Sequence, residues 1–378
     1  MIKSYKIRLY PTKEQEQKMW QHIGACRYIW NYMLALQQQR YKDGEKHLSR
    51  FDTINLLKPL KQEEEKSWLK NVANTSLCMV CSDLAKAYDT FFKKQGGFPK
   101  FKSRKKSKTN FPTRYDALWF SETLVNIEKI GKVAYKTDFE IPLGRGNKFT
   151  NPRVLYRNGK WMLGFGMECE NQAHTLTDKP MGIDLGIKET MTVAYGDEQI
   201  VFHNINKSRK VRLFKKQMRH LQRSISRKYE ANRQGNKYIK THNIERAEEK
   251  FRKMYARLTN IRNNYIHQCT HRLVSLLPCR VVMEDLNVQG MMKNRHLSKA
   301  IQEQCFFEII RQMKYKCEWN SIPFCQVDRF YPSSKTCSCC GHVKRDLKLS
   351  DRTYICSECG TVIDRDFNAA INLQRYSA

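Results

Sequence analysis

CRVVMEDLN, residues Cys279–Asn287, is the stretch on which the organisation of the chain depends. Its apolar centre predicts a short buried strand, and Glu284 stands where that strand ends. Three other segments go with it: MGIDLGIK (Met181–Lys188) upstream, and two CxxCG units (Cys337–Gly360) and DRDFNAAINL (Asp364–Leu373) downstream. Together the four segments predict an acidic site that is split along the sequence, with a zinc module set into it.

The charge of the chain indicates a polyanionic partner. Lysine and arginine number 69 against 37 aspartates and glutamates, a formal net charge of +32 over 378 residues. This excess is too large for an ordinary globular surface, and no apolar run is long enough to cross a bilayer. We therefore expect nucleic acid rather than a membrane as the partner, and the length predicts two or three domains.

The N-terminus and the cysteines indicate an intracellular protein. Residues 1–15, MIKSYKIRLYPTKEQ, lack the apolar core of a signal peptide. Fourteen cysteines are present. In a basic chain without a secretion signal they predict free thiols and metal ligands rather than disulfides.

The first half of the chain opens with a strand and continues with helices. Alternating apolar and basic residues over Met1–Tyr10 predict the strand. Thr12 and Gln15 have the spacing of a helix-capping box. Apolar residues then recur at helical spacing, and a second helical block is expected over about Thr53–Lys94.

Residues Leu124–Glu170 are rich in predicted strands. Arg153–Phe165 consists of two alternating runs around Asn158-Gly159, which predicts a hairpin with a type I′ turn. Combined with the first strand, this segment predicts a small β-barrel or sandwich, with the helices of the first half inserted into it.

Residues Gly96–Pro112 form a basic run that is interleaved with Phe98, Phe101 and Phe111. Phosphate contacts combined with base stacking would use both kinds of residue, whereas a solvated linker would need only the charges. The phenylalanines favour contact with nucleic acid. The basic residues expected there are Lys100, Lys102, Arg104, Lys105 and Lys106.

The second half of the chain predicts a sheet interrupted by a pair of helices. GIDLGIKETMTVAYG (Gly182–Gly196) gives two strands. Lys207–Leu277 then predicts two antiparallel helices with facing apolar stripes, broken near Gly235. After the strand that ends at the MED acids, a helix is expected over about Lys299–Trp319 and a strand over Phe324–Phe330.

The outer face of the first of these two helices is strongly basic and has almost no acids to balance it. Such a run is commonly only a solvated face, but the imbalance here favours a surface that contacts phosphates. The residues expected to make these contacts are Arg219, Arg223 and Arg227.

Two CxxCG units predict a structural zinc site. Cys337 and Cys340 form one unit, Cys356 and Cys359 form the other, and a glycine follows each. Four thiolates at this spacing are typical of a zinc ribbon, and they leave no open position on the metal. Cys339 is a spare thiol that could replace a neighbour, but the symmetry of the two units argues against it.

Three acids stand at predicted strand ends or at a helix start. Asp184 lies within a strand, Glu284 ends one, and Asp366 precedes FNAAINL, a helix with small residues on one face. Acids that converge repel one another, and divalent cations relieve the repulsion. If the three acids converge on one site, we expect two Mg²⁺ or Mn²⁺ ions there, which could act on a phosphodiester. Asp285 and Asp364 remain rival ligands, unless they cap helices instead, and Asp184 could be a turn residue.

The ordered series of motifs resembles the TnpB family, the RNA-guided nucleases encoded by bacterial insertion sequences and relatives of the type V CRISPR effectors. In the second half of the chain the resemblance rests on GIDLGI, VMEDLN, YPSSKTCSCCG, YICSECG and DRDFNAAINL. In the first half, KIRLYPTKEQ, GACRYIWN and GFPKFKSR resemble the opening blocks of that family. The resemblance thus extends over nearly the whole chain.

By this resemblance the fold is α/β and multidomain, with an RNase H-like (RuvC-like) nuclease core that carries inserted helices and a zinc ribbon. The N-terminal part would be a β-barrel wedge domain with an inserted helical recognition domain. The implied domains are the wedge at 1–10 and 96–178, the recognition domain at 11–95, the nuclease domain at 179–336 and 361–378, and the zinc ribbon at 337–360.

The resemblance also implies the activity. Asp184, Glu284 and Asp366 match the three acids of the family's RuvC-like active site, whose third acid is the second aspartate of DRD. The family binds a guide RNA derived from the transposon end and cleaves double-stranded DNA beside a short transposon-adjacent motif, so base pairing would read the target. We therefore expect an RNA-guided, metal-dependent DNA endonuclease of a mobile element, in the bacterial cytoplasm and on the nucleoid when bound to DNA.

Two other functions stay open on the sequence. A transposase, or an accessory protein acting on transposon ends, would have to join DNA, but the chain lacks a His-hydrophobic-His motif with a tyrosine nucleophile. A non-cleaving, RNA-guided DNA-binding regulator would have a broken set of acids, whereas all three are present here. The sequence is compatible with a homodimer and does not require one.

Overall fold

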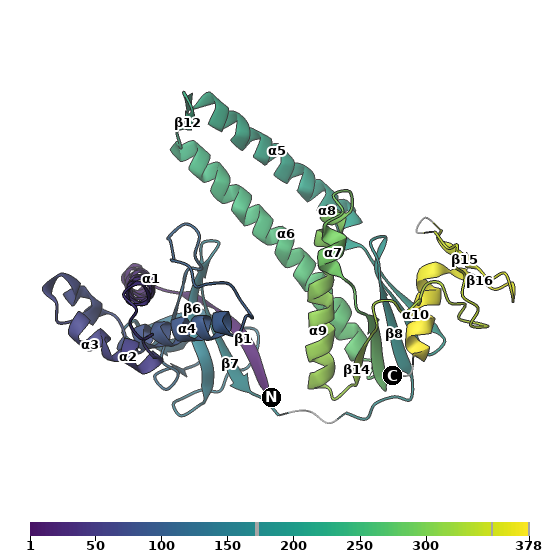
Figure 1. Ribbon diagram of the computed structural model, residues 1–378, viewed down its shortest axis with the longest axis horizontal. Coiled ribbons are helices and arrows are strands. Elements are labelled where there is room, and N and C mark those ends of the chain that lie inside the picture. Colours follow the sequence, from purple (N-terminus) through teal and green to yellow (C-terminus); the bar gives the residue numbers. More distant parts are fainter. Residues whose placement is uncertain (171–173, 349–350, 377–378) are drawn as a thin grey trace. The chain divides into compact units, whose positions relative to one another are not determined.

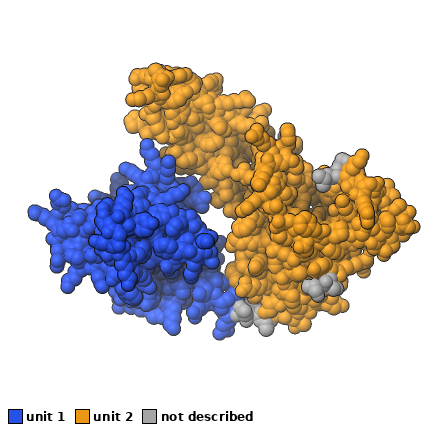
Figure 2. Space-filling model, viewed as in Figure 1, with its two compact units in different colours: residues 1–170 blue, residues 171–378 orange. Residues whose placement is uncertain are grey.

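The computed structural model describes residues 1–170, 174–348 and 351–376. It divides the chain into two compact units, Met1–Glu170 and Asn171–Ala378 (Figure 2), each with its own hydrophobic core. Three pieces of the predicted domains lie outside the described residues: 171–173 of the wedge, 349–350 of the ribbon and 377–378 of the nuclease segment.

The first unit is a seven-stranded antiparallel sheet with a helical insertion after its first strand. The strand order is β2-β6-β7-β1-β5-β4-β3. Its elements are β1 (Ile2–Tyr10), α1 (Lys13–Lys42), α2 (Arg50–Asn55), α3 (Leu57–Leu60), η1 (Glu64–Asn71), α4 (Asn74–Phe92), β2 (Asn110–Pro112), β3 (Trp119–Phe120), β4 (Leu124–Ile127), β5 (Gly131–Lys136), β6 (Phe149–Arg157) and β7 (Lys160–Glu168).

Local signals in this unit predicted the right structure. On β1, Ile7 and Leu9 are buried while Lys6 is exposed. The capping box at the start of α1 is formed in both directions, by the Thr12 hydroxyl and the side chain of the third helical residue. The β6–β7 hairpin turns at Asn158 and Gly159 with φ of 54° and 77°, the positive values that a type I′ turn requires.

Two features of this unit differ from the prediction. The second helical block is four separate elements, because Pro59 offers no N–H to continue a helix and Val72 is extended. The predicted barrel is a curled sheet: its edge strands β2 and β3 are not hydrogen-bonded to each other among the described residues. Phe120 of edge strand β3 nevertheless lies 5.1 Å from Phe149 of β6 and 5.4 Å from Phe165 of β7, between ring centroids, so the sheet bends round on itself.

The second unit is built on a five-stranded mixed sheet of order β10-β9-β8-β13-β14. The pairs β8–β13 and β13–β14 are parallel, and β8–β9 and β9–β10 are antiparallel. The first elements are β8 (Pro180–Leu185), β9 (Glu189–Tyr195), β10 (Glu198–His203), η2 (Ile205–Lys207), α5 (Arg209–Ala231), β11 (Arg233–Gln234), β12 (Lys237–Tyr238), α6 (His242–Val274) and β13 (Arg280–Glu284). They are followed by α7 (Val288–Met292), α8 (Ser298–Gln304), α9 (Phe306–Trp319), β14 (Phe324–Val327), β15 (Thr353–Ile355), β16 (Val362–Asp364) and α10 (Arg365–Arg375).

Helices cover both faces of this sheet (Figure 1). The C-terminal half of α6 and α9 bury one face, through a core that includes Ile266, Leu273, Ile309 and Met313. Helix α10 lies on the other face, where Leu373 packs with Val282 and Val327. The alternation of side chains along each strand therefore assigns every strand residue to one of two distinct environments.

The predicted helical pair is present as α5 and α6, antiparallel and joined by the short β11–β12 hairpin that contains Gly235 (Figure 1). The helix predicted over about Lys299–Trp319 is two helices, because Cys305 has left-handed backbone angles (φ 56°) between α8 and α9. The strand predicted to reach Phe330 ends at Val327. Among the described residues, no helix combines the length and the apolar character that crossing a membrane would demand.

Candidate functional site

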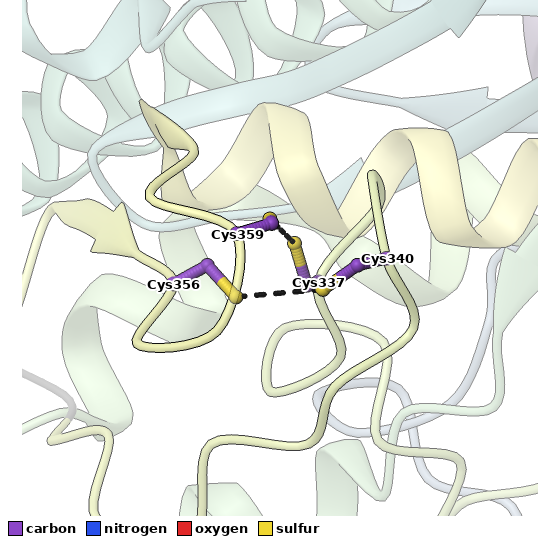
Figure 3. A group of neighbouring side chains, drawn as sticks. All are labelled: Cys337, Cys340, Cys356 and Cys359. Carbon is purple, nitrogen blue, oxygen red and sulfur yellow. Dashed lines mark hydrogen bonds between the residues drawn. The ribbon is translucent and has the colours of Figure 1, made fainter.

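The four predicted zinc cysteines come together. The sulfur atoms of Cys340 and Cys356 are 3.5 Å apart and those of Cys337 and Cys359 are 3.7 Å apart (Figure 3). All four lie within 4.8 Å of one another. Tetrahedral zinc with bonds of about 2.3 Å places its sulfur ligands roughly 3.8 Å apart. The cluster therefore has the chemistry and the dimensions of a structural zinc site with four cysteine ligands, and Cys339, which is exposed, is not part of it.

Two matching turns build this cluster. Gly341 and Gly360 adopt φ of 78° and 70°, which disfavours any residue with a Cβ. Their N–H groups donate to the carbonyls of Cys337 and Cys356, at 3.0 and 3.2 Å. The ring of Tyr354 is fully buried, and its hydroxyl lies within donating distance of the carbonyls of Lys335 and His342, on either side of the first turn. The glycine that follows each CxxC unit is thus required by the backbone.

The zinc module is attached to α10 through two asparagines. Asn368 is buried, accepts the N–H of Ser338 at 2.8 Å and donates to the Thr336 carbonyl at 2.7 Å. Asn372, one helical turn on, donates to the carbonyls of Ser333 and Thr336 at 2.7 and 2.6 Å. The segment that enters the first cysteine turn is therefore fixed to the helix that carries Asp366.

Strand alternation places two of the three predicted acids on one face of the sheet. On β8, Ile183 belongs to the core beneath α6 and α9, so its neighbours Gly182 and Asp184 face α10. On β13, Val282 packs in the cluster that α10 covers, and Glu284, two residues on, lies on the same face. Both acids stand at or near the carboxyl ends of adjacent parallel strands.

The third acid is delivered by α10. A Cβ on Gly182 would lie 2.0 Å from the carbonyl oxygen of Ala370, so only glycine lets the helix approach β8 this closely. Asp366 is in the first turn of α10. Its Oδ2 lies 4.0 Å from the position that a Cβ on Gly186, just after β8, would occupy. The close contact of helix and strand therefore brings Asp366 to the end of β8.

The electrostatics indicate that the three acids lie close together. Burial, followed by the negative charges of Glu284 and Asp366, raises the pKa of Asp184 well above its usual range. Burial also raises the pKa of Glu284; the hydrogen bond from the Ser333 hydroxyl opposes this shift, and the charge of Asp366 adds to it. The Arg365 guanidinium lies 3.2 Å from Asp366 Oδ1 and offsets part of the negative charge.

The two rival acids have other contacts. Asp285 forms an ion pair with Arg329 at 3.0 Å, and both side chains are about half exposed. Asp364 is the N-cap of α10, and its Oδ1 accepts the N–H groups of Asp366 and Phe367, each at 3.0 Å. Asp364 thus caps a helix, and its negative charge also contributes to the raised pKa of Asp184.

The basic loop after α4 is only partly free. Lys102 is half-buried, its Nζ lies 3.5 Å from the ring centroid of Trp30, and burial lowers its pKa. Its backbone is held by the side chain of Asn31 on α1. The other basic residues predicted to bind here are exposed: Lys100, Arg104, Lys105 and Lys106. Lys102 thus anchors the loop while its neighbours are available to a ligand.

On α5, the three predicted arginines Arg219, Arg223 and Arg227 are exposed and follow one another at a spacing of four residues, which puts them on one helix face. Among the described residues, no acid lies within ion-pair distance of any of them. On α6, by contrast, acids pair with several of the bases, as in Lys253–Glu249 at 2.6 Å.

Sequence reasoning missed Ser333, Asn368 and Asn372. Ser333 lies four residues before Cys337, in the stretch that enters the zinc module. The two asparagines stand four apart in DRDFNAAINL, a spacing that puts two amides on one face of a helix whose other residues are mainly apolar. That amide pair was the available signal for a polar contact buried under the helix.

Family models match most of the second unit and the start of the first. The model described as "Cas12f1-like, TNB domain" matches residues 306–373, which contain the four cysteines and Asp366. The IS605 OrfB model, described as "Probable transposase", matches residues 165–295, which contain Asp184 and Glu284. A "Helix-turn-helix domain" model of the same OrfB group matches residues 1–46, where the structure has one strand and one long helix, α1.

Relatives of similar length decide the family. The chain is 31% identical over 375 residues to a "Putative RNA-guided DNA endonuclease" of Streptomyces pristinaespiralis, an alignment that covers 98% of this chain and 88% of that one. The chain belongs to the TnpB family. TnpB relatives include "Putative RNA-guided DNA endonuclease InsQ" of Escherichia coli, 27% identical over 98% of this chain and 91% of that protein.

The TnpB chain also shares its fold with a larger group. The cryo-EM structure of a Cas12f1-sgRNA-target DNA complex matches 99% of this chain and 98% of that one, with a TM-score of 0.61 at 12% sequence identity. The mixed α/β, multidomain fold of this TnpB protein is therefore like that of Cas12f, and its zinc cluster lies in the TNB domain.

Proposed function

We propose that this chain is an RNA-guided, divalent-metal-dependent DNA endonuclease of a mobile element, which cleaves DNA next to a short transposon-adjacent motif. The observation that carries the proposal is the placement of Asp184, Glu284 and Asp366, three acids from distant parts of the sequence, on the side of one sheet that α10 covers. The names of the relatives in Streptomyces and Escherichia coli support the activity.

The chemistry of the three acids supports the proposal that they bind Mg²⁺ or Mn²⁺. Their carboxylate oxygens are the ligands that these hard cations prefer. Burial and the charges of neighbouring acids raise the pKa values of Asp184 and Glu284, and bound cations would relieve the repulsion between these charges. Two bound ions would activate a water and neutralise charge that develops on a phosphodiester.

The chain's own residues would orient this site. Asp184 and Glu284 are fixed by adjacent parallel strands, and Asp366 by a helix that glycine allows to lie directly on β8. The Ser333 hydroxyl holds one oxygen of Glu284 and leaves the other free. Arg365, which is paired with Asp366, would supply a positive charge to a phosphate bound at the acids. The zinc module would be structural, because four thiolates leave no open position on the metal.

We assign the parts of the chain by the same likeness. The five-stranded sheet with its inserted α5–α6 pair is proposed as the RuvC-like, RNase H-like nuclease core at 179–336 and 361–378. The cysteine turns at 337–360 would be its inserted zinc ribbon. The curled sheet of the first unit would be the wedge domain at 1–10 and 96–178, and its inserted helices the recognition domain at 11–95.

The partners proposed are a guide RNA from the transposon end and a double-stranded DNA target. The net charge of +32 supports two polyanions at once. The exposed arginine face Arg219–Arg227 and the exposed lysines of the 100–106 loop would contact their phosphates. The matching Cas12f1 structure holds an sgRNA and a target DNA, which supports this arrangement by analogy.

The test is to purify the protein from cells that carry its native locus and to sequence the RNA that accompanies it. The complex is then incubated with Mg²⁺ and a plasmid library matched to that RNA. The proposal predicts cleavage that depends on the guide and on a short adjacent motif. Guided binding without cleavage would favour a regulator, and joining of transposon ends without a guide would favour a transposase.

A further inference from the structure

The turn after β14 lies at the acidic site. β14 runs parallel to β13, and its last residue, Val327, is paired with Glu284, the last residue of β13. The chain that leaves β14 therefore starts at the same edge of the sheet as the Glu284 carboxylate. Two contacts keep it there: the Arg329 guanidinium donates to Asp285 at 3.0 Å, and the Ser333 hydroxyl donates to Glu284.

Phe330 stands between these two contacts, with its ring in solvent. Its side chain is 87% exposed, the highest value for a large hydrophobic residue in the described part of the chain. The backbone N–H of Phe330 donates to Asp328 Oδ1 at 2.8 Å, and the next N–H donates to the Asp328 carbonyl at 3.0 Å. The neighbouring ring, Tyr331, points inward and lies 5.2 Å from the ring of Tyr376. The turn thus holds one aromatic ring in and the other out.

Nothing in the described residues covers the outward ring: no other ring or cation lies against Phe330. An exposed phenyl group at the edge of the acidic site leaves apolar surface in water, which an occupant of that site could cover. A ligand that covers Phe330 must have a flat apolar face. The rest of the ligand must suit a strongly basic protein and lie beside the acids. A base of a nucleic acid strand offers that face, and its phosphates suit the charge.

We propose that Phe330 stacks on one unpaired base of the DNA strand whose phosphate lies at Asp184, Glu284 and Asp366. In a duplex both faces of a base are already stacked, so the ring selects a strand that has been separated from its complement. Stacking then fixes the register of the strand and presents one phosphate to the acids. This inference rests on the proposed function, because it takes DNA as the occupant of the acidic site.

The test uses the full-length protein with its copurified RNA and short single-stranded DNA oligonucleotides. Each oligonucleotide carries 2-aminopurine at a different position, and Ca²⁺ replaces Mg²⁺ to prevent hydrolysis. The fluorescence of 2-aminopurine falls when it stacks on an aromatic ring. The variants compared are Phe330→Ala, Phe330→Leu and Phe330→Trp. Phe307→Ala is the control, because Phe307 is 71% exposed on α9, which covers the opposite face of the sheet from α10.

We expect quenching at one position with the wild type, with Phe330→Trp and with the control, and its loss with Phe330→Ala and Phe330→Leu. Affinity for the oligonucleotide falls about tenfold in Phe330→Ala, the loss of one base stack. With Mg²⁺, KM rises by a similar factor and kcat changes little.

Unchanged quenching in Phe330→Ala overturns the inference. If that variant instead converts a dimer to a monomer in light scattering with quenching intact, the ring belongs to an interface between two copies of the chain, and the inference fails as well. Quenching that depends on Phe330 in a protein that never cleaves DNA leaves the stacking role standing and removes the nuclease proposal.

Discussion

The zinc cluster and the acidic site are assembled in opposite ways. The four cysteines come from two similar turns within Cys337–Cys359, and each turn forms its own half of the site. The three acids come from β8, β13 and α10, so no segment of the chain holds two of them in place. A site made of local turns can be recognised from its spacing, whereas a site made by a sheet exists only once the tertiary structure has formed.

Hydrogen bonds nevertheless connect the zinc module with the acidic site. The zinc module is inserted in the chain between Glu284 and Asp366. Asn368 and Asn372 bind the segment that enters the zinc module (residues 333–338) to α10. Ser333 in that segment donates a hydrogen bond to Glu284. These hydrogen bonds act as a clamp: they hold α10 and Glu284 to the zinc module. The variants below test how far the acidic site depends on the zinc module.

Removal of the zinc site has the largest expected effect. Cys356→Ser should lose the metal and with it on the order of 10–16 kcal/mol of apparent binding free energy, which is also folding free energy of the module. The clamp on α10 is then released, so cleavage should be abolished as well. Metal analysis and limited proteolysis between residues 337 and 360 measure this. Cys339→Ser is the matched control and should keep zinc, since its thiol is exposed and lies outside the cluster; stoichiometric zinc in Cys356→Ser would contradict the assignment.

Asn372→Ala should weaken the clamp without touching the metal. The buried amide donates to the carbonyls of Ser333 and Thr336; in the variant the Ser333 carbonyl loses this donor, while the Thr336 carbonyl keeps Asn368. We expect the free energy of unfolding in urea to fall by about 2 kcal/mol, with the zinc content unchanged. Asn264→Ala, at an exposed position of α6, should lower the free energy of unfolding by less than about 0.5 kcal/mol. Equal stability of the two variants would show that α10 does not depend on this contact.

Ser333→Ala removes the direct hydrogen bond between the segment that enters the zinc module and Glu284. Glu284 loses the donor that holds one of its oxygens, and we expect cleavage to slow by about tenfold, the value of one hydrogen bond to a charged group. Ser333→Thr should restore most of the rate because it keeps the hydroxyl. The adjacent Ser334→Ala serves as control. If Ser334→Ala slows cleavage as much as Ser333→Ala does, the hydrogen bond to Glu284 does not connect the two sites.

The smallest expected effect is on pH dependence without Mg²⁺. The folded state raises the pKa of Asp184, so the folded protein binds this proton more tightly than the unfolded chain does. Its unfolding free energy should therefore decrease as the pH rises above about 4, the ordinary pKa of an aspartate, toward the raised value. Asp184→Asn should flatten that slope. Parallel pH curves for the two proteins would mean that Asp184 does not experience the charges of the other acids.

The contrast between the two sites also explains what the sequence could predict. The CxxCG spacing, the Asn158-Gly159 turn and the Thr12 capping box are local, and the structure has all three. The grouping of Asp184, Glu284 and Asp366 was expected from resemblance to a family, because strand ends alone do not say which strands are neighbours.

Other features had no sequence signal strong enough to find them. The left-handed Cys305 that separates α8 from α9 occurs in an otherwise regular helical pattern. The exposure of Phe330 depends on a turn fixed by Asp328, inside a stretch that alternates as a strand does. The curl of the first sheet depends on contacts between strands as far apart as β3 and β6.

The most direct measurement compares Asp184→Asn with Asp285→Asn in guide-dependent DNA cleavage, with zinc content and copurified RNA determined for each. Both changes neutralise one aspartate near the end of a strand, but Asp285 is half-exposed and paired with Arg329. We expect Asp184→Asn to lower cleavage about a thousandfold or more, from the loss of several kcal/mol of charge stabilisation, with zinc and RNA retained. Asp285→Asn should stay within about tenfold of the wild type. Intact cleavage in Asp184→Asn, or an equal loss in both variants, would contradict the assembled acidic site.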